Sequence, residues 1–274
     1  MVPLAPAFPA VSALCRLPAT GPAAVFWVPI HFSIPGGGNA IEEIVLRWIH
    51  FVAGTIWIGL LYFFNLAATP ALGRLEPEMR ARITIGLMPR TLAWFRWSAL
   101  VTVLAGLRYY TILLAQDAHN AGRDGLMWTW LWHWLVVWMA AYVLIHGLMM
   151  PVSGPMNRAI VRAPLVGIVA IAASWIILDW NGGADVSNAS LAIAVGGGLG
   201  LAMLFIVWGF VWRAQKRLLR WTRDQAETGK PLPAEAAKLA RRALVGSRVG
   251  FWLSLPMLFF MGAAEHFPFL SAGR

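Results

Sequence analysis

Three runs of the sequence, 48–69, 126–152 and 189–212, contain no charged side chain. A helix of about 20 apolar residues is long enough to cross a hydrocarbon core about 30 Å thick, and each run exceeds that length. Only 12% of the residues are charged, against about a quarter in an ordinary soluble domain. The sequence therefore excludes a water-soluble globule and predicts an all-α, polytopic transmembrane helix bundle.

About six membrane spans are expected in one domain over residues 41–270. Their predicted ranges are 41–66, 95–115, 127–150, 164–180, 190–212 and 250–269. Residues 1–40 are rich in proline and end in Gly36-Gly37-Gly38, so we expect a poorly ordered leader there. A cleaved signal peptide is the alternative, but Pro22 and Pro29 interrupt the apolar stretch that it would need.

Basic residues alternate from one predicted loop to the next. Most of the 22 lysines and arginines fall between spans one and two, between spans three and four, and in the segment 213–248. Short loops rich in Lys and Arg stay on the cytoplasmic side. We therefore expect both termini outside, which in a bacterial inner membrane is the periplasmic side. The net charge of +10 then reports topology and a basic cytoplasmic loop that attracts anionic lipid, and no nucleic-acid partner is expected.

The chain has one cysteine, Cys15, so a CxxCH haem site and cysteine-based zinc or iron–sulfur sites are excluded. Histidines are the remaining candidate ligands, because a histidine inside a membrane is costly unless it is paired or ligating. His50, His133 and His266 all fall in the outer halves of predicted spans. Imidazoles on facing helices typically ligate a non-covalent b-type haem. We expect these three to bind the cofactor, with His50 and His266 as candidate iron ligands.

The first span carries the clearest pattern around His50. Gly54 and Trp57 follow at offsets of +4 and +7, which places them on the same helix face. Gly54 would let the edge of a macrocycle approach the backbone, and Trp57 would pack on it. Arg47, one turn further out, could pair with a haem propionate. The alternative is close helix packing at Gly54 beside a hydrogen-bonded histidine.

Three more charged residues have possible functional roles. Arg108, near the outer end of the second span, could meet an anionic substrate or a propionate. Glu265, beside His266, is a candidate acid–base group, although an interfacial carboxylate facing water needs no such role. Arg96 lies between aromatic residues at the inner end of the second span and is either functional or a snorkelling interfacial arginine.

Four sequence blocks resemble one known family. They are 50–65 (HFVAGTIWIGLLYFFN), 94–97 (WFRW), 207–216 (VWGFVWRAQK) and 240–266, which ends in SLPMLFFMGAAEH. The chain resembles the membrane domain of the bacterial cytochrome-c-linked urate oxidases, also called membrane urate hydroxylases. A similar first helix occurs in copper-resistance membrane proteins and membrane protoporphyrinogen oxidases, which lack the last block.

The resemblance implies an integral membrane enzyme that oxidises urate to 5-hydroxyisourate and passes electrons to cytochrome c. In that family a c-type cytochrome domain follows the membrane domain, whereas this sequence contains no CxxCH motif. A separate cytochrome c or another periplasmic acceptor would then be needed. The matching motif residues are His50, Gly54, Trp57, Asn65, Arg96, Pro256 and His266.

The expected function is thus oxidation of urate or a related purine, with electrons leaving through a b-type haem. Arg47 or Arg108 would hold the anion, and Glu265 or a histidine would accept a proton. One alternative is a haem-b electron-transfer or anchor subunit of a larger respiratory complex. A second alternative is a non-redox transporter in which Arg47, His50 and Glu265 line the path.

Overall fold

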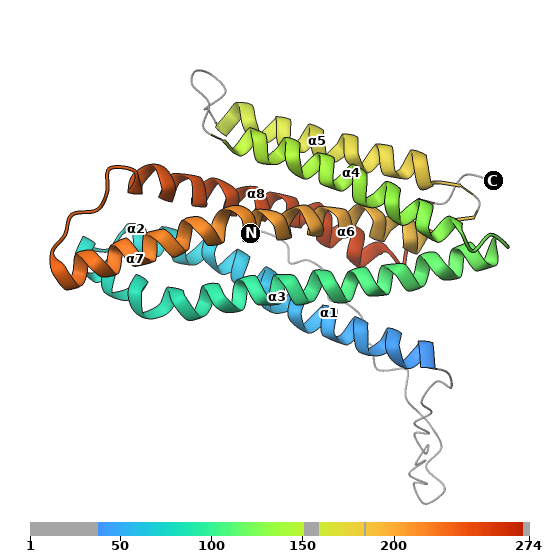
Figure 1. Ribbon diagram of the computed structural model, residues 1–274, viewed down its shortest axis with the longest axis horizontal. Coiled ribbons are helices and arrows are strands. Elements are labelled where there is room, and N and C mark those ends of the chain that lie inside the picture. Colours follow the sequence, from blue (N-terminus) through green and yellow to red (C-terminus); the bar gives the residue numbers. More distant parts are fainter. Residues whose placement is uncertain (1–37, 151–158, 184, 271–274) are drawn as a thin grey trace, which may run out of the picture. The chain divides into compact units, whose positions relative to one another are not determined.

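The computed structural model describes residues 38–150, 159–183 and 185–270 (Figure 1). The elements in chain order are α1 (Gly38–Tyr62), η1 (Phe63–Ala68), α2 (Thr69–Gly73), α3 (Pro77–Asn120), α4 (Leu126–Met149), α5 (Ala159–Asn181), α6 (Asn188–Ile206), η3 (Val207–Val211), α7 (Trp212–Thr228) and α8 (Ala236–Ala263). The segments η1 and η3 are π-helical. The described residues contain no strand, so the predicted all-α class is confirmed.

Six helices in the described part of the chain are long and apolar enough to cross a membrane. They coincide with the six predicted spans, and this is the architecture of a multi-pass membrane protein. The described residues belong to one compact unit. The leader expected over 1–40 lies, except for its last three residues, outside the described residues.

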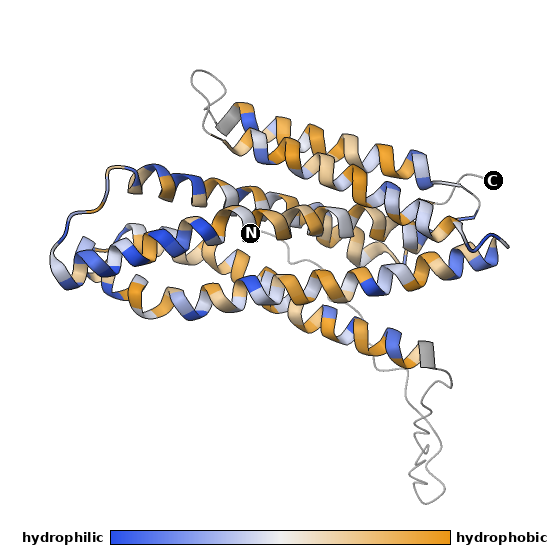
Figure 2. Ribbon diagram, viewed as in Figure 1, coloured by the Kyte–Doolittle hydropathy of each residue, from blue (hydrophilic) through white to orange (hydrophobic). Residues whose placement is uncertain are grey.

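Three helices extend well beyond their predicted spans: α3, the continuous helix Asn188–Thr228, and α8. α3 has 44 residues, and the continuous helix Asn188–Thr228 has 41. At 1.5 Å per residue each is about 60 Å or more in length, roughly twice the thickness of a hydrocarbon core. Figure 2 shows hydrophilic residues gathered on α7 and on the first turns of α3 and α8. A hydropathy pattern ends at the first charged residues, whereas backbone hydrogen bonding continues beyond them.

The last span is the clearest correction to a predicted boundary. A helix is expected over 250–269, but α8 begins at Ala236 and ends at Ala263. The backbone N–H groups of His266 and Phe267 both donate to the Ala263 carbonyl, which closes a turn at that end. Glu265 and His266 therefore lie in a turn beyond the helix rather than inside a span.

α6 packs against α3, α4, α5 and α8. Its glycines and alanines permit close contact, and a Cβ atom at Gly198 would overlap the indole of Trp138 on α4. Trp134 and Trp138 both donate their indole N–H to the carbonyl of Ala194, over 2.9 and 3.0 Å. These two hydrogen bonds satisfy polar groups that have no water available and fix α4 against α6.

α1 packs mainly against α3 and runs antiparallel to α8. Asn65 donates its amide to the hydroxyl of Ser247 over 2.9 Å, and the Ser254 hydroxyl donates to Tyr62 over 3.2 Å. As the residue number rises along α1, its partner's number falls along α8. These two contacts define one end of the α1–α8 interface, and the other end opens into a cavity.

Candidate functional site

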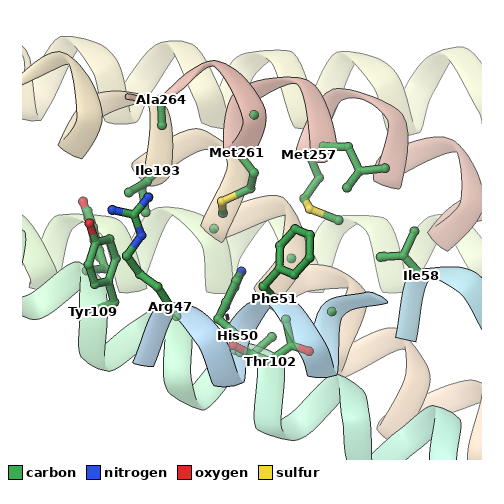
Figure 3. Close-up of a pocket in the computed structure, with 18 of the residues that line it drawn as sticks. Arg47, His50, Phe51, Ile58, Thr102, Tyr109, Ile193, Met257, Met261 and Ala264 are labelled. Atoms are coloured by element: carbon green, nitrogen blue, oxygen red, sulfur yellow. Dashed lines mark hydrogen bonds between the residues drawn. The ribbon is translucent and has the colours of Figure 1, made fainter. Parts of the chain in front are cut away.

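A cavity of about 670 Å³ lies between α1, α3, α6 and α8 and is also lined by Trp134 of α4. Its walls are largely apolar, and polar groups gather at one end (Figure 3). Small-molecule and cofactor pockets typically have volumes of roughly 300 to 1,000 Å³ and the same mixture of walls. The cavity is therefore the main candidate site in the described residues.

His50 of α1 is the central polar group of the cavity. Its Nδ1 lies 2.8 Å from the backbone carbonyl oxygen of Thr102 on α3. A carbonyl oxygen only accepts, so Nδ1 carries the proton and donates it. Nε2 is then the unprotonated nitrogen, and Figure 3 shows it directed into the cavity. A histidine whose Nδ1–H is fixed by a backbone carbonyl has the typical arrangement of a metal-ligating imidazole.

Gly106 on α3 makes this contact possible. A Cβ atom at Gly106 would lie 2.7 Å from both Cε1 and Nδ1 of the His50 ring. In an α-helix, residue 106 donates its N–H to the carbonyl of residue 102, so its side chain would lie beside that oxygen. The missing side chain exposes the Thr102 carbonyl to the imidazole.

Gly54 and Trp57 both line the cavity, on the same face of α1 as His50. A Cβ atom at Gly54 would meet the methyl group of Thr102 at 3.5 Å, an ordinary van der Waals contact, so the packing of α1 on α3 does not itself require a glycine here. Trp57 is only 1% exposed, and its indole Nε1 has no hydrogen-bond partner among the described residues. Trp57 is therefore packed among its neighbours at the deeper end of the cavity, and only a small part of its ring borders it.

A charged cluster closes the polar end of the cavity, which we call the mouth. It consists of Arg47, Tyr109, Glu265 and the neighbouring His266. Arg47 donates to Glu265 over 2.6 Å, and the Tyr109 hydroxyl donates to the other carboxylate oxygen over 3.0 Å. The Arg47 guanidinium also lies 5.7 Å from the centre of the Tyr109 ring. Because Arg47 and Glu265 neutralise each other, the mouth has no net charge when His266 is neutral.

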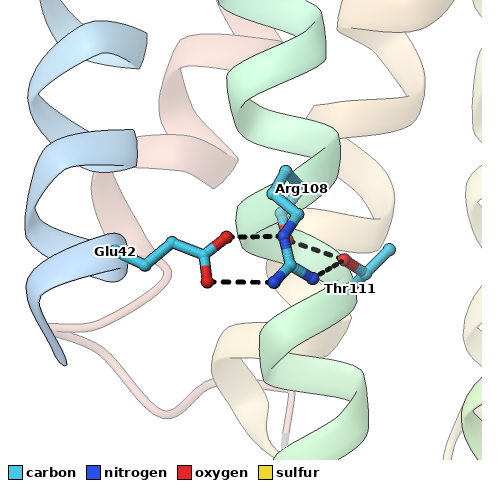
Figure 4. A network of polar contacts seen from close by, with 3 residues as sticks. All are labelled: Glu42, Arg108 and Thr111. Atoms are coloured by element: carbon cyan, nitrogen blue, oxygen red, sulfur yellow. Dashed lines mark hydrogen bonds and ion pairs between the residues drawn. The ribbon is translucent and has the colours of Figure 1, made fainter. Parts of the chain in front are cut away.

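Two of the predicted site residues lie outside the cavity lining. Arg108 forms a two-pronged ion pair with Glu42 on α1, with distances of 2.7 and 2.9 Å (Figure 4). The His133 ring on α4 lies 3.0 Å from the side-chain oxygen of Asn181 on α5. Asn181 in turn donates to the carbonyl of Trp130, so His133 belongs to an α4–α5 contact.

Arg96, at the inner end of the bundle, lies among three tryptophans. Its guanidinium is 3.9 Å from the ring centre of Trp212 and 5.2 and 5.5 Å from those of Trp97 and Trp208. The Trp208 indole also donates to the Arg96 carbonyl over 3.1 Å. Cation–π contacts of this kind join α3 to η3 and α7, and they give Arg96 a packing role away from the cavity.

The sequence interpretation did not single out five residues of the site. They are Thr102, Gly106, Tyr109, Met257 and Met261, all of which line the cavity. One signal was available, because Gly106 follows Thr102 by four residues in an apolar helix, and such a glycine exposes a carbonyl. The methionines carry no signal of their own, since methionine is an ordinary residue of apolar helices.

No protein-family model, curated protein or solved structure matches this chain. Within the described residues, no group of three or more His, Cys, Asp or Glu side chains could hold a free metal ion. A haem iron needs only one or two protein ligands, because the macrocycle supplies four nitrogens. The single imidazole of His50 in the cavity is therefore compatible with such a group.

Proposed function

We propose that this chain is an integral membrane redox protein that binds one b-type haem in the cavity, with His50 as an iron ligand. The observation that supports this best is the His50 imidazole, which is fixed through Nδ1 by the Thr102 carbonyl and directs Nε2 into an apolar cavity. Haem, when bound, would supply one-electron transfer between a reductant and an acceptor.

The other residues of the cavity fit the shape and charge of that group. The apolar walls exclude water, and Gly54 leaves room beside the α1 backbone for the edge of a flat ring. Trp57 borders the deeper end, where it is almost fully buried. Arg47 and Tyr109 lie at the mouth, where they can donate hydrogen bonds to carboxylates. Arg47 has five N–H donors, so it can hold a second anion while it remains paired with Glu265.

We further propose that the reductant is urate or a related purine and that the acceptor is cytochrome c or another periplasmic electron carrier. This part rests on the sequence resemblance. Oxidation of urate to 5-hydroxyisourate takes its oxygen from water and releases two electrons and two protons. Arg47 would hold the urate anion at the mouth. Glu265 and His266, which lie beside Arg47, are the groups there that can accept protons.

The proposed location is a bacterial inner membrane with both termini on the periplasmic side. The distribution of basic residues supports this, because ten of them fall in the segment 213–248. The cavity mouth lies at the opposite end of α8, beside Ala264 and Glu265. In this orientation the mouth opens toward the periplasm, where the acceptor would be found.

The neutral mouth also favours a second candidate function. Because Arg47 is already paired with Glu265, it attracts an anionic substrate less strongly than an unpaired arginine would. A haem-b electron-transfer or anchor subunit, with the same haem and no substrate of its own, needs no such cation.

Spectra of the purified protein in detergent test the proposal and separate the two functions. After expression with a sufficient haem supply, the reduced-minus-oxidised spectrum should show a b-type haem. Anaerobic addition of urate should then reduce this haem if the chain is the enzyme, whereas the subunit would be reduced by dithionite and unaffected by urate. A folded wild-type protein without haem would refute both redox functions. The non-redox transporter would then be the remaining candidate.

A further inference from the structure

We infer that the second axial ligand of the haem is the thioether of Met261 on α8, opposite His50. This inference rests on the proposed haem site and assigns a residue that the sequence interpretation left out in favour of His266. It follows from three observations: the depth of each residue in the α1–α8 pair, the seat of the Met261 methyl group, and the direction of the His50 ring.

The ion pair between Arg47 and Glu265 fixes the depth of the two helices at the mouth. α1 runs inward from this level, so His50 lies three residues, or about 4.5 Å, deeper than Arg47. α8 runs in the opposite direction, so Met261 lies four residues, about one helical turn, deeper than Glu265. His50 and Met261 therefore lie at similar depth on facing walls of the cavity.

Side-chain directions add slightly to this difference in depth. Side chains in an α-helix lean toward its N-terminus. The His50 side chain consequently leans outward along α1, and the Met261 side chain leans inward along α8. Figure 3 shows the Met261 sulfur on the wall that the free nitrogen of His50 faces, with Met257 displaced toward Ile58.

The terminal methyl group of Met261 is held by two glycines of α6. Cβ atoms at Gly196 and Gly197 would lie 3.2 and 3.6 Å from the Met261 Cε. The absence of these side chains creates a seat for the methyl group on the α6 side. Met261 itself lines the cavity, on the opposite side from His50.

His266 is less well placed for the same role. It follows the end of α8 in an exposed turn, next to Glu265 at the level of Arg47. Its position is therefore about one helical turn outward of His50. Ligation by His266 would require this turn to fold inward past the Arg47–Glu265 pair, whereas Met261 needs only a rotation about its side-chain bonds.

Methionine ligation would have a measurable consequence for the redox chemistry. A thioether is a softer donor than an imidazole and raises the reduction potential of haem relative to two histidines. A higher potential makes the haem a better acceptor of electrons. The ligand pair His50 and Met261 thus suits a haem that takes electrons from an organic reductant.

The test compares Met261→Leu with Met257→Leu, a matched change one turn deeper on the same helix. Ferric haem with a thioether ligand shows a weak sulfur-to-iron charge-transfer band in the far red, which bis-histidine haem lacks. We expect this band in the wild type and in Met257→Leu and its loss in Met261→Leu, together with a lower reduction potential. Haem content and gel-filtration profile should remain at the wild-type level in both variants.

Each other outcome has a definite meaning. A haem whose far-red band is absent in the wild type, and whose low-spin signal is lost in His266→Ala, would overturn the assignment and establish two histidine ligands. Loss of the band in Met257→Leu alone would identify Met257, one turn deeper, as the ligand and would overturn the assignment of Met261. Wild-type protein without haem would refute the proposed function itself, so the two failures are distinguishable.

Discussion

α6 and α1 are both apolar enough to cross a membrane, yet they are used in opposite ways. In the most apolar window of the helix that begins as α6, 89% of the residues are buried, whereas the corresponding share for the helix that begins as α1 is 17%. α6 is surrounded by other helices, and its small residues serve packing. α1 is peripheral: its outer face exposes Trp48 and Val52, and its inner face presents His50 to the cavity. The chemistry thus lies on the less buried helix, beside a rigid core.

The largest expected effect comes from breaking the packing of α6. Gly198→Ala forces a Cβ atom into the indole of Trp138, which is fully buried and hydrogen-bonded to Ala194. Overpacking of this kind costs typically 1–3 kcal/mol and sometimes more. We expect a clear fall in the thermal unfolding temperature of the detergent-solubilised protein.

Gly200→Ala is the matched control for this change. Gly200 is also buried on α6, but a Cβ atom there would meet nothing within 4 Å. Its unfolding temperature should equal or slightly exceed that of the wild type. Equal losses in the two variants would show that α6 does not pack against Trp138 as described.

The next largest effect is expected at the cavity, where a variant should change haem binding but not the stability of the helix core. Gly106→Ala places a Cβ atom against the His50 ring and pushes it off the Thr102 carbonyl. Loss of such a supporting hydrogen bond typically lowers metal affinity 10- to 100-fold. Haem content should fall while the unfolding temperature of the apo-protein changes little. Gly86→Ala, on the same helix with open space around it, should retain its haem; an equal loss there would contradict this explanation.

The sequence predicts the membrane spans of this protein better than it predicts the ends of the helices. The long apolar stretches are sufficient to predict six spans, because a hydrocarbon core requires them. Helix ends in water depend on backbone hydrogen bonds that hydropathy does not reflect, so α3 and α7 extend beyond their predicted spans and α8 ends before Glu265.

The site residues on α1 were predictable because they share one helix. His50, Gly54 and Trp57 repeat at helical spacing, and all three line the cavity. Contacts between helices were not predictable in the same way. The partner of His133 depends on how α4 packs on α5, and Arg108 is diverted from the cavity by Glu42, sixty-six residues away.

A smaller effect is expected at the mouth. Arg47→Gln removes the ion pair with Glu265, whose side chains are 55% and 34% exposed. Partly exposed pairs contribute about 1 kcal/mol or less, so the fold and the haem content should persist. If urate binds at the mouth, the urate concentration needed for half-maximal haem reduction should rise several-fold. Tyr109→Phe, which keeps the ion pair, should show a smaller rise. Unchanged urate dependence in both variants would show that urate does not bind at the mouth.

The smallest effect is expected at Arg108. Its ion pair with Glu42 is 54% and 38% exposed and lies outside the cavity lining. Arg108→Gln should leave stability nearly unchanged and haem content and urate-dependent reduction unchanged. Loss of urate-dependent reduction in this variant, with the haem retained, would show that Arg108 takes part in substrate binding.

The most direct test of the central claim is the haem content of His50→Ala measured beside that of His133→Ala. Both changes remove a half-buried imidazole from a transmembrane helix, but only His50 lines the cavity. We predict one b-type haem per chain in the wild type, the same content in His133→Ala, and loss of haem from a folded His50→Ala protein. Full haem content in His50→Ala, with loss in His133→Ala, would contradict the assignment of the cavity as the haem site.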